Sequence, residues 1–319
     1  MKFVRNSLLL NELVLVDGIG RSGKVMLAEI LTGFERMEKQ DYNEFLEYIP
    51  LAYKYKKISK DMAIAILQTQ LDTELYKNMI GRSINNRPTD YTSLSKYHTP
   101  DKYIKRQQEE DGPIIGAKVL KEKPIYLNWC HDLIQKSDII FEAFQDKVKF
   151  IYINRRPVDI IYEWDKKNFG ERIANDSTEM QYVIEHNNSF VPETAVGWED
   201  EYLKMKPLER IVKLIHTSFK RNLDSIMINI EKIMIVNFED LVTEPNKTIK
   251  DISSFLKVQP MQDILLDILA KENCPRILSH EDYMSRKKNI TENLGVEYQD
   301  LLQDLESMYY KLYNILNKD

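Results

Sequence analysis

Short apolar runs alternate with longer amphipathic segments along most of this chain. The runs at 13–16, 148–153 and 233–238 (LVLV, VKFIYI and IMIVNF) have the length and the branched composition that are typical of buried strands. We also expect a strand at 113–120 (PIIGAKVL) and a short strand at 34–40. Runs that are mostly apolar, rather than alternating, favour a sheet that is covered on both faces.

Apolar residues three or four positions apart predict helices between and after these strands. One predicted helix begins at Val158, and the others cover residues 24–31, 41–56, 60–80, 129–144, 211–230, 241–256 and 298–316. Strands that alternate with helices of this length indicate a three-layer α/β fold with a central, mainly parallel sheet flanked by helices. Ligands of such sheets bind at the carboxyl ends of the strands.

No linker rich in proline, glycine or serine divides the chain. Its 319 residues, 43% of them hydrophobic, are enough for one full core. We therefore predict a single domain over 1–319, with a helical and polar insertion at about 41–112 and a helical C-terminal part at about 257–319.

Charge and cysteine content narrow the partners and the compartment. A net charge of −5 provides no general attraction to nucleic acid or to an anionic membrane. Two cysteines are too few for a disulfide scaffold and suit a reducing compartment. We recognise neither a signal peptide nor an apolar run of about 18 residues. We expect a cytoplasmic protein without a nucleic-acid or membrane partner, and its oligomeric state stays open.

A glycine-rich turn connects the first strand to the first helix. From Gly18 to Lys24 the letters fit G-x-x-x-x-G-K, in a strand–turn–helix context where backbone N–H groups and a helix N-terminus hold an anion. Val25 follows at the position where a nucleotide triphosphatase needs Ser or Thr as a magnesium ligand. The turn therefore predicts a phosphate-like ligand and argues against ordinary magnesium–ATP chemistry.

A second candidate anion contact follows the strand at 148–153. Arg155 is expected to present a planar guanidinium at the end of that strand, a geometry that suits a phosphate. Pro157 has the fixed φ that favours a helix start, and Asp159 in the first helical turn complements the helix dipole. We therefore expect Arg155 and the glycine turn at the same edge of the sheet.

Taken in order, these segments resemble the sulfotransferase superfamily. Residues 20–25 (GRSGKV) stand where that family has P-[RK]-S-G-T-T, and 155–159 (RRPVD) is similar to its R-[ND]-P-x-D motif. Residues 236–245 (VNFEDLVTEP) resemble its Y-E-D-L segment, in which Glu239 and Asp240 are expected to cap a helix and brace basic groups.

The resemblance implies the donor 3′-phosphoadenosine 5′-phosphosulfate and no metal. In that family the loop holds the phosphosulfate end, while the motif arginine and a serine eight residues later hold the 3′-phosphate. Here Glu163 stands at the serine position, where a carboxylate repels phosphate unless it turns outward or pairs with Arg156 or a lysine. The donor-binding residues that the resemblance implies are Gly20, Arg21, Ser22, Gly23, Lys24, Val25, Arg155, Glu163, Arg286 and Lys287.

Sulfuryl transfer moves a group with dispersed negative charge, so it needs positioned cations and a base. Arg21 and Lys24 are our candidates for the cations. Glu38 is our first candidate for the base that takes the proton from the acceptor. Its rivals are Glu35, Asp41, Glu44, Lys118 and His131.

The polar loop at 79–97 could hold a polyhydroxylated or anionic acceptor such as a sugar, with an apolar wall from Trp164 and Trp198. The candidate acceptor-binding residues are Arg82, Asn86, Arg87, Lys118 and His131. We predict a sulfotransferase that acts on a hydroxyl or amine of a small molecule or glycan. The alternatives are a P-loop small-molecule kinase and a non-catalytic nucleotide-binding protein of the same fold.

Overall fold

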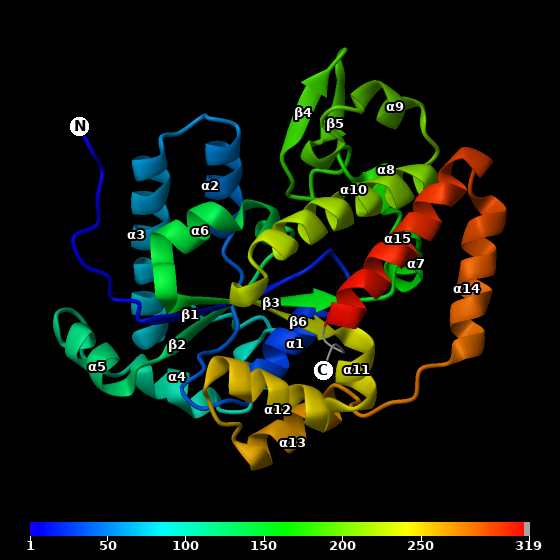
Figure 1. Cartoon of the computed structure of the whole chain (residues 1–319). Coiled ribbons are helices and arrows are strands. Elements are labelled where there is room, and N and C mark those ends of the chain that lie inside the picture. Colours follow the sequence, from blue (N-terminus) through cyan, green and yellow to red (C-terminus); the bar gives the residue numbers. More distant parts are fainter. Residues whose placement is uncertain (316–319) are drawn as a thin grey trace.

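Four parallel strands form the centre of the molecule, in the spatial order β2-β1-β3-β6 (Figure 1). The structure is a computed structural model that describes residues 1–315. Leu15 of β1 lies opposite Asn128 of β2 and opposite Phe150 of β3. The predicted α/β fold with a central parallel sheet is therefore confirmed. The strands are β1 (Glu12–Asp17), β2 (Ile125–Trp129), β3 (Val148–Asn154) and β6 (Ile233–Asn237).

Successive residues of β1 enter two hydrophobic cores on the two faces of the sheet. Leu13 and Leu15 belong to one core, and Val14 and Val16 belong to the other. All four side chains are at most 3% exposed. Burial on both faces explains why this strand is an uninterrupted apolar run in the sequence.

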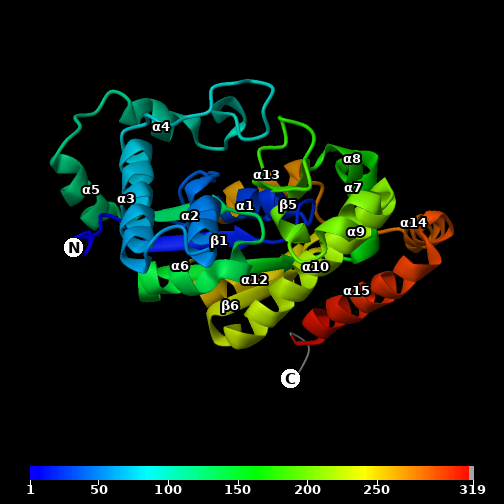
Figure 2. The same ribbon diagram turned by 90° about the horizontal axis from the view of Figure 1, so that it is seen from above.

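Helices cover both faces of the sheet. The larger core packs against α3 (Lys60–Met79), α6 (Ser137–Phe144), α10 (Pro207–Ile228) and α15 (Val296–Ile315). The smaller core packs against α1 (Lys24–Leu31), α12 (Pro245–Leu256) and α13 (Gln262–Lys271). Figure 2 shows α2 (Phe45–Lys54) and α3 at one end of the molecule and α14 (His280–Asn293) at the other.

Most of the predicted helices are present. The helix expected at 60–80 is α3, and those expected at 24–31 and 211–230 are α1 and α10. Two helices, α11 (Phe238–Thr243) and α12, occupy the region of the helix expected at 241–256, and α12 begins at Pro245. The helix expected to begin at Val158 is α7 (Pro157–Lys166). The helix expected at 298–316 is α15, and Leu316 lies outside the described residues.

Two strand predictions were wrong. Residues 113–120 contribute to α5 (Ile114–Glu122), in which Ile115 and Val119, four residues apart, are buried while Leu120 is exposed. Residues 34–40 form no continuous strand and make only isolated bridges, a parallel one from Met37 to Ile125 of β2 and an antiparallel one from Phe34 to Pro260. The missing sheet strand is β2 itself, whose last residue, Trp129, was predicted to begin a helix over 129–144. That segment continues as η2 (Leu133–Lys136) and α6.

A small antiparallel hairpin, which we did not predict, lies apart from the main sheet. It consists of β4 (Val183–His186) and β5 (Ser189–Pro192) and follows the short helix α8 (Phe169–Arg172). The preceding segment contacts α2, because the Tyr48 hydroxyl donates a hydrogen bond to the Met180 carbonyl at 2.8 Å. The Tyr48 and Tyr182 rings also lie 4.5 Å apart. The segment before the hairpin therefore packs against α2.

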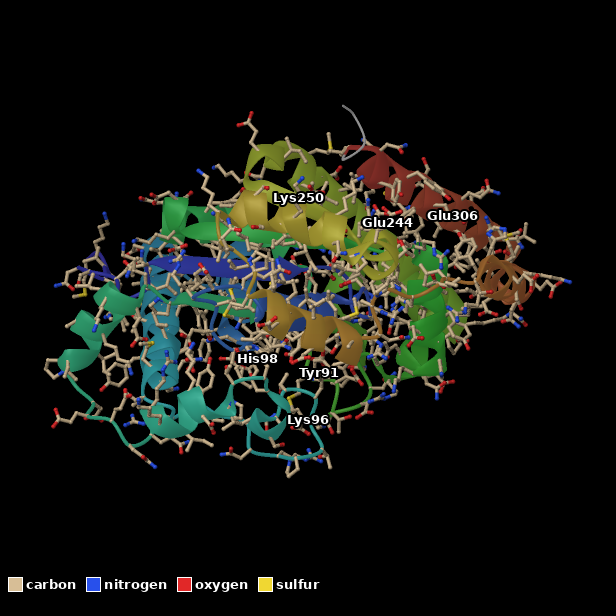
Figure 3. The ribbon with its side chains drawn as sticks, turned by 90° about the horizontal axis from the view of Figure 1, so that it is seen from below. Tyr91, Lys96, His98, Glu244, Lys250 and Glu306 are labelled. Atoms are coloured by element: carbon tan, nitrogen blue, oxygen red, sulfur yellow. The ribbon has the colours of Figure 1, made fainter. Side chains whose placement is uncertain are left out.

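The polar loop between α3 and α4 (Pro100–Arg106) packs against α1 and α13. The Tyr91 hydroxyl donates to Glu272 Oε1 at 2.6 Å, and His98 Nε2 lies 3.1 Å from Thr32 Oγ1. Figure 3 shows Tyr91, Lys96 and His98 together on this side of the molecule. None of the helices within residues 1–315 has the length and apolar character needed to span a bilayer.

Candidate functional site

The glycine loop joins the buried strand β1 to the first turn of α1. Gly23 is the residue before this helix and has a φ of +100°, a conformation that glycine adopts without strain. A Cβ atom at Gly23 would also lie 2.5 Å from the Phe238 ring. Position 23 therefore requires glycine, both for its backbone conformation and for the space that Phe238 occupies.

Lys24 points back into the loop that precedes it. Its ammonium donates hydrogen bonds to the carbonyl oxygens of Gly18 and Ile19 at 3.0 and 3.2 Å. The side chain is only 3% exposed, and its burial lowers the pKa of this ammonium. Lys24 therefore holds the loop in shape and also places a positive charge beneath it.

Asp17, the last residue of β1, connects this loop to the loop after β2. One carboxylate oxygen accepts a hydrogen bond from the Gly18 N–H at 2.8 Å, and the other accepts one from the Ile134 N–H at 2.6 Å. Complete burial, together with the nearby charge of Asp132, raises the pKa of Asp17 to about 7.

Arg155 lies against the glycine loop, as its place after β3 predicted. Its Nη1 donates to the Arg21 carbonyl at 2.7 Å, and its guanidinium lies 4.3 Å from the Phe238 ring centroid. Its buried Nε makes no hydrogen bond to any described residue. One buried donor of Arg155 is therefore still available to a ligand.

The helix α7 places two further side chains beside the loop. Trp164 Nε1 donates to the Gly20 carbonyl at 2.8 Å. Glu163 Oε2 lies 3.3 Å from Nη2 of Arg21, so the carboxylate at the family's serine position pairs with the loop arginine. The sequence left two outcomes open for Glu163: its carboxylate turns outward, or it pairs with Arg156 or a lysine. Arg156 instead pairs with Asp159 at 2.7 Å.

A cleft of about 630 Å³ opens from this loop. The implied donor residues Gly20, Arg21, Gly23, Lys24, Val25, Arg155 and Glu163 all contribute to its wall, and Ser22 is buried beneath them. The rest of the wall is largely aromatic and apolar, and it includes Tyr48, Leu51, Phe169, Ile173, Tyr182 and Leu214. Trp164 lines the cleft, whereas Trp198 does not.

Glu47 and His131 form a hydrogen-bonded pair on the cleft wall. Glu47 Oε1 lies 3.1 Å from His131 Nδ1 and accepts the backbone N–H of His131 at 2.7 Å. The Tyr42 hydroxyl donates to the other oxygen of Glu47 at 3.2 Å. Burial alone would raise the pKa of Glu47, but the hydrogen bonds and charge of His131 lower it. Glu47 is therefore a carboxylate, and Nδ1 of His131 carries the proton that it accepts.

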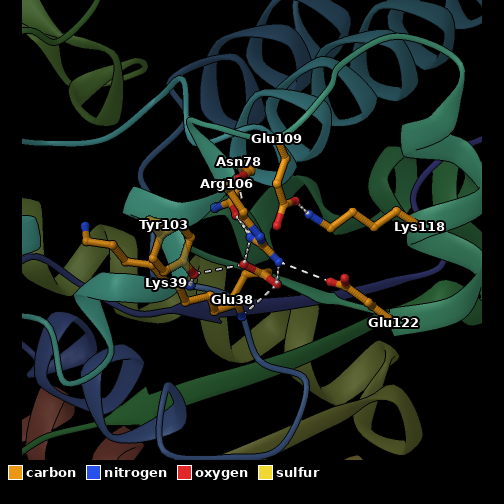
Figure 4. Close-up of polar contacts among 9 residues, drawn as sticks. Glu38, Lys39, Asn78, Tyr103, Arg106, Glu109, Lys118 and Glu122 are labelled. Atoms are coloured by element: carbon orange, nitrogen blue, oxygen red, sulfur yellow. Dashed lines mark hydrogen bonds and ion pairs between the residues drawn. The ribbon is translucent and has the colours of Figure 1, made fainter.

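Glu38, our first candidate for the base, does not line this cleft. Its carboxylate is 1% exposed and accepts hydrogen bonds from Arg106 at 2.7 and 3.0 Å, from Lys102 at 3.0 Å and from the Tyr103 hydroxyl at 2.8 Å (Figure 4). Burial would raise its pKa, but the Arg106 and Lys102 contacts lower it. Both oxygens of Glu38 are engaged, so the structure does not place this residue where it could take a proton from an acceptor in the cleft.

The other predicted residues are also distributed away from the cleft. Arg286 pairs with Asp159 at 2.8 Å and Lys287 pairs with Glu306 at 2.7 Å, so they attach α14 to α7 and α15. Arg82, Asn86 and Arg87 are exposed on the loop after α3. Lys118, on α5, forms an ion pair with Glu109, which precedes that helix. Of the predicted acceptor residues, His131 alone lines the cleft.

Sequence reasoning missed Glu47, Tyr42, Asp132 and Lys136, which line the cleft. Glu47 is one of several carboxylates in a predicted helix, and no local pattern distinguishes it. Asp132 and Lys136 follow β2, so a strand assigned to 125–129 would have placed them at the carboxyl edge of the sheet. Within residues 1–315, no three His, Cys, Asp or Glu side chains gather as a metal site would require.

The chain is similar to known sulfotransferase domains. The family model of the sulfotransferase domain matches residues 131–303. The sulfotransferase domain from the curacin biosynthetic pathway is 14% identical to this chain. The alignment covers 93% of this chain and 98% of that domain, with a TM-score of 0.50. The sulfotransferase domain of the Synechococcus PCC 7002 olefin synthase is 14% identical, with coverages of 100% and 99% and a TM-score of 0.45. A sulfotransferase from Alicyclobacillus acidocaldarius is 12% identical, with coverages of 96% and 95% and a TM-score of 0.42. The curated protein sequences contain no match.

Proposed function

Because the chain belongs to the sulfotransferase domain family, we propose that it transfers a sulfuryl group from 3′-phosphoadenosine 5′-phosphosulfate to a hydroxyl or amine of a small molecule or glycan. The observation that carries this proposal is one shared cleft. The glycine loop, Glu47, His131 and Arg155 come from four distant parts of the chain, and all line it.

The loop residues fit the phosphosulfate end of this donor. The first-turn N–H groups of α1, which begins directly after Gly23, are free of intrahelical partners, as at the N-terminus of any helix. Arg155 has a buried Nε with no described partner, which suits a phosphate oxygen. When bound, the donor supplies the activated sulfuryl group.

Two cations lie beside the loop where charge would develop. Lys24 is buried under the loop, and Arg21 lies on the cleft wall with a side chain that is 46% exposed. Positioned positive charge in a site sheltered from water is the main means of stabilising such a transfer. We assign this role to Arg21 and Lys24, with Glu163 restraining the position of Arg21.

We assign the base to His131 rather than to Glu38. Because Nδ1 of His131 faces Glu47, Nε2 retains the lone pair that can accept a proton from an acceptor hydroxyl. Glu47 fixes the orientation of the ring and would stabilise the protonated imidazole, as the third group of a nucleophile–base–carboxylate arrangement does. The His131 side chain is 42% exposed, so an acceptor in the cleft can reach it.

We also infer a cytoplasmic location. Cys130 and Cys274 are both free and buried, which suits a compartment where thiols stay reduced. Nothing beyond the nucleotide donor and the acceptor is proposed as a partner.

Calorimetric titration with adenosine 3′,5′-bisphosphate tests the donor site directly. We expect the bisphosphate to bind without a metal ion, and Arg155→Ala to weaken binding about 10- to 100-fold, the loss of charged hydrogen bonds worth roughly 1.5–3 kcal/mol. The matched control is Arg87→Ala, which removes an exposed arginine away from the cleft.

Binding of ATP only in the presence of magnesium, with no bisphosphate binding, would overturn the proposal in favour of a P-loop kinase. If neither nucleotide binds, the protein has this fold but does not catalyse the transfer. In either case the assignments of His131 and Arg21 would be withdrawn.

A further inference from the structure

A second, smaller cavity adjoins the cleft. Its volume is about 190 Å³, and it lies between the start of the insertion and the loop after α3. Tyr42 and Trp129 contribute to the walls of both cavities, and their rings stack with centroids 4.6 Å apart and an interplanar angle of 21°. The stacked rings therefore form a shared wall between the reaction cleft and this second cavity.

The second cavity differs from the cleft in the chemistry of its lining. Every residue that lines it is polar, charged or aromatic. The cleft, in contrast, includes the aliphatic residues Leu51, Ile173 and Leu214. The fold thus places a cavity without aliphatic side chains beside a cleft that has both charged and apolar walls.

Several polar groups of the second cavity lack partners within the described part of the chain. Gln40 is 2% exposed; its Nε2 donates to Glu29 Oε2 at 2.6 Å, which leaves its Oε1 without a hydrogen bond. Trp129 Nε1 is likewise buried without an acceptor. The ammonium of Lys39, whose residue is 9% exposed, makes no ion pair with any described residue. Buried polar groups are nearly always paired, so the Gln40 and Trp129 atoms call for a ligand or ordered water.

The charges around the cavity favour an uncharged ligand. Lys39 contributes one positive charge, but Asp41 and Glu74 place two carboxyl groups on the same wall. Asp41 accepts the Tyr126 hydroxyl at 2.9 Å, and Glu74 accepts Lys77 at 2.8 Å, so each keeps further acceptor capacity. An anion would meet both carboxyl groups, and a cation would meet Lys39. A group with hydroxyls that donate and accept would satisfy all three.

We propose that this cavity binds an uncharged, polyhydroxylated unit of the size of one sugar ring. The volume corresponds to about six water molecules, enough for such a unit. The aromatic wall of Tyr42 and Trp129 suits the apolar face of a sugar ring. Ser83, Asn85 and Thr92 come from the polar loop in which the sequence predicted a polyhydroxylated acceptor.

The place of this unit in the reaction rests on the proposed function. If the cleft transfers a sulfuryl group, the acceptor combines an apolar or aromatic body in the cleft with a sugar-like group beyond the Tyr42–Trp129 stack. Glucose, galactose and mannose as their methyl glycosides are suitable probes, because they carry no charge and need no donor to bind.

Saturation-transfer NMR with these three glycosides, and with glucuronate as the anionic comparison, tests the site. We expect at least one glycoside to bind in preference to glucuronate. Lys39→Met or Thr92→Val should each weaken it about 2- to 10-fold, the usual effect of one net hydrogen bond. Lys105→Met, which changes an exposed lysine on α4, should leave glycoside binding unchanged.

Three results would overturn the inference: no glycoside binding, tighter binding of glucuronate, or glycoside binding that neither cavity variant alters. Adenosine 3′,5′-bisphosphate titration of the same variants keeps the two proposals separate. Bisphosphate binding without glycoside binding refutes the second cavity as a sugar site, whereas the reverse result refutes the sulfotransferase proposal.

Discussion

The carboxylate of Asp17 accepts the backbone N–H of Ile134 at 2.6 Å, which joins the end of β1 to the loop that follows β2. Its second oxygen accepts the N–H of Gly18. One buried side chain therefore positions both the glycine loop and the loop that carries His131. Asp17 touches neither ligand site itself, so we regard it as a positioning residue.

Asp17→Asn should change how the stability of the protein depends on pH. The folded-state pKa of Asp17 is raised to about 7 from an ordinary value of 3.8, so between these values the folded protein holds a proton that the unfolded chain releases. This group therefore makes the free energy of unfolding fall as pH rises from about 4 to 7, by on the order of 4 kcal/mol. Asparagine removes that contribution, and urea titrations across this pH range measure it.

The matched control for Asp17 is Asp146→Asn, at an exposed position after α6. The control should keep the wild-type slope of unfolding free energy against pH. An Asp17→Asn variant with the same slope as the wild type would show that Asp17 is not protonated in the folded protein.

His131→Ala should raise the pKa of the Glu47 carboxyl. The hydrogen bonds and charge of His131 now oppose the effect of burial, so their loss leaves burial dominant. In the wild type, Glu47 stabilises the fold above its unfolded pKa, and this contribution is lost as pH falls through its lower folded pKa. In the variant the sign reverses, and stability falls as pH rises. Carbon-13 NMR of the glutamate side chains measures the shift, and an unchanged Glu47 titration would contradict the pairing.

Glu38→Ala should destabilise the fold by about 3–5 kcal/mol, because it leaves the guanidinium of Arg106 buried without its carboxylate. Glu109→Ala removes a partly exposed partner of Lys118 and should cost no more than about 1 kcal/mol. Urea unfolding measures the loss of stability in each of these two variants. If Glu38→Gln keeps the wild-type stability and bisphosphate affinity but abolishes sulfuryl transfer, Glu38 and not His131 is the base.

Glu163→Ser should tighten the binding of adenosine 3′,5′-bisphosphate several-fold. The substitution removes a carboxylate next to the proposed phosphate site and releases Arg21, whose Nη2 lies 3.3 Å from it. Asp165→Ser removes an exposed carboxylate from the same helix and should have little effect. Calorimetry reports both affinities, and weaker binding by Glu163→Ser would mean that Arg21 needs its carboxylate partner for a productive position.

The glycine loop and the position of Arg155 beside it could be predicted because their signals are local. β1 and the glycine loop that contains Gly23 are contiguous in the sequence. Arg155 comes directly after β3, which is an apolar strand. The family match begins at residue 131, so the glycine loop was identified by its own strand–turn–helix pattern and not by similarity across the whole chain.

The acceptor side could not be predicted in the same way. Glu47 and His131 lie 84 positions apart and meet only when β2 has paired with β1. β2 is a five-residue strand that we overlooked, because the apolar spacing of the following segment suggested a helix from Trp129. The helix α5 was predicted as a strand because a short apolar run fits a strand as well as a helix.

The Glu38–Arg106 ion pair has a consequence for how this protein can diverge. The two residues stand 68 positions apart, so their ion pair joins the two ends of the segment 38–106. We call this segment, which leaves the sheet and returns to it, the excursion. The entropic cost of closing such an excursion grows only slowly with its length. Segments between these two residues can therefore be lengthened, shortened or exchanged while the ion pair returns the chain to the same place. Because α2 with Glu47 and the loop of the second cavity both lie in that excursion, its exchange would remodel the acceptor-facing walls and leave the glycine loop and Arg155 unaltered.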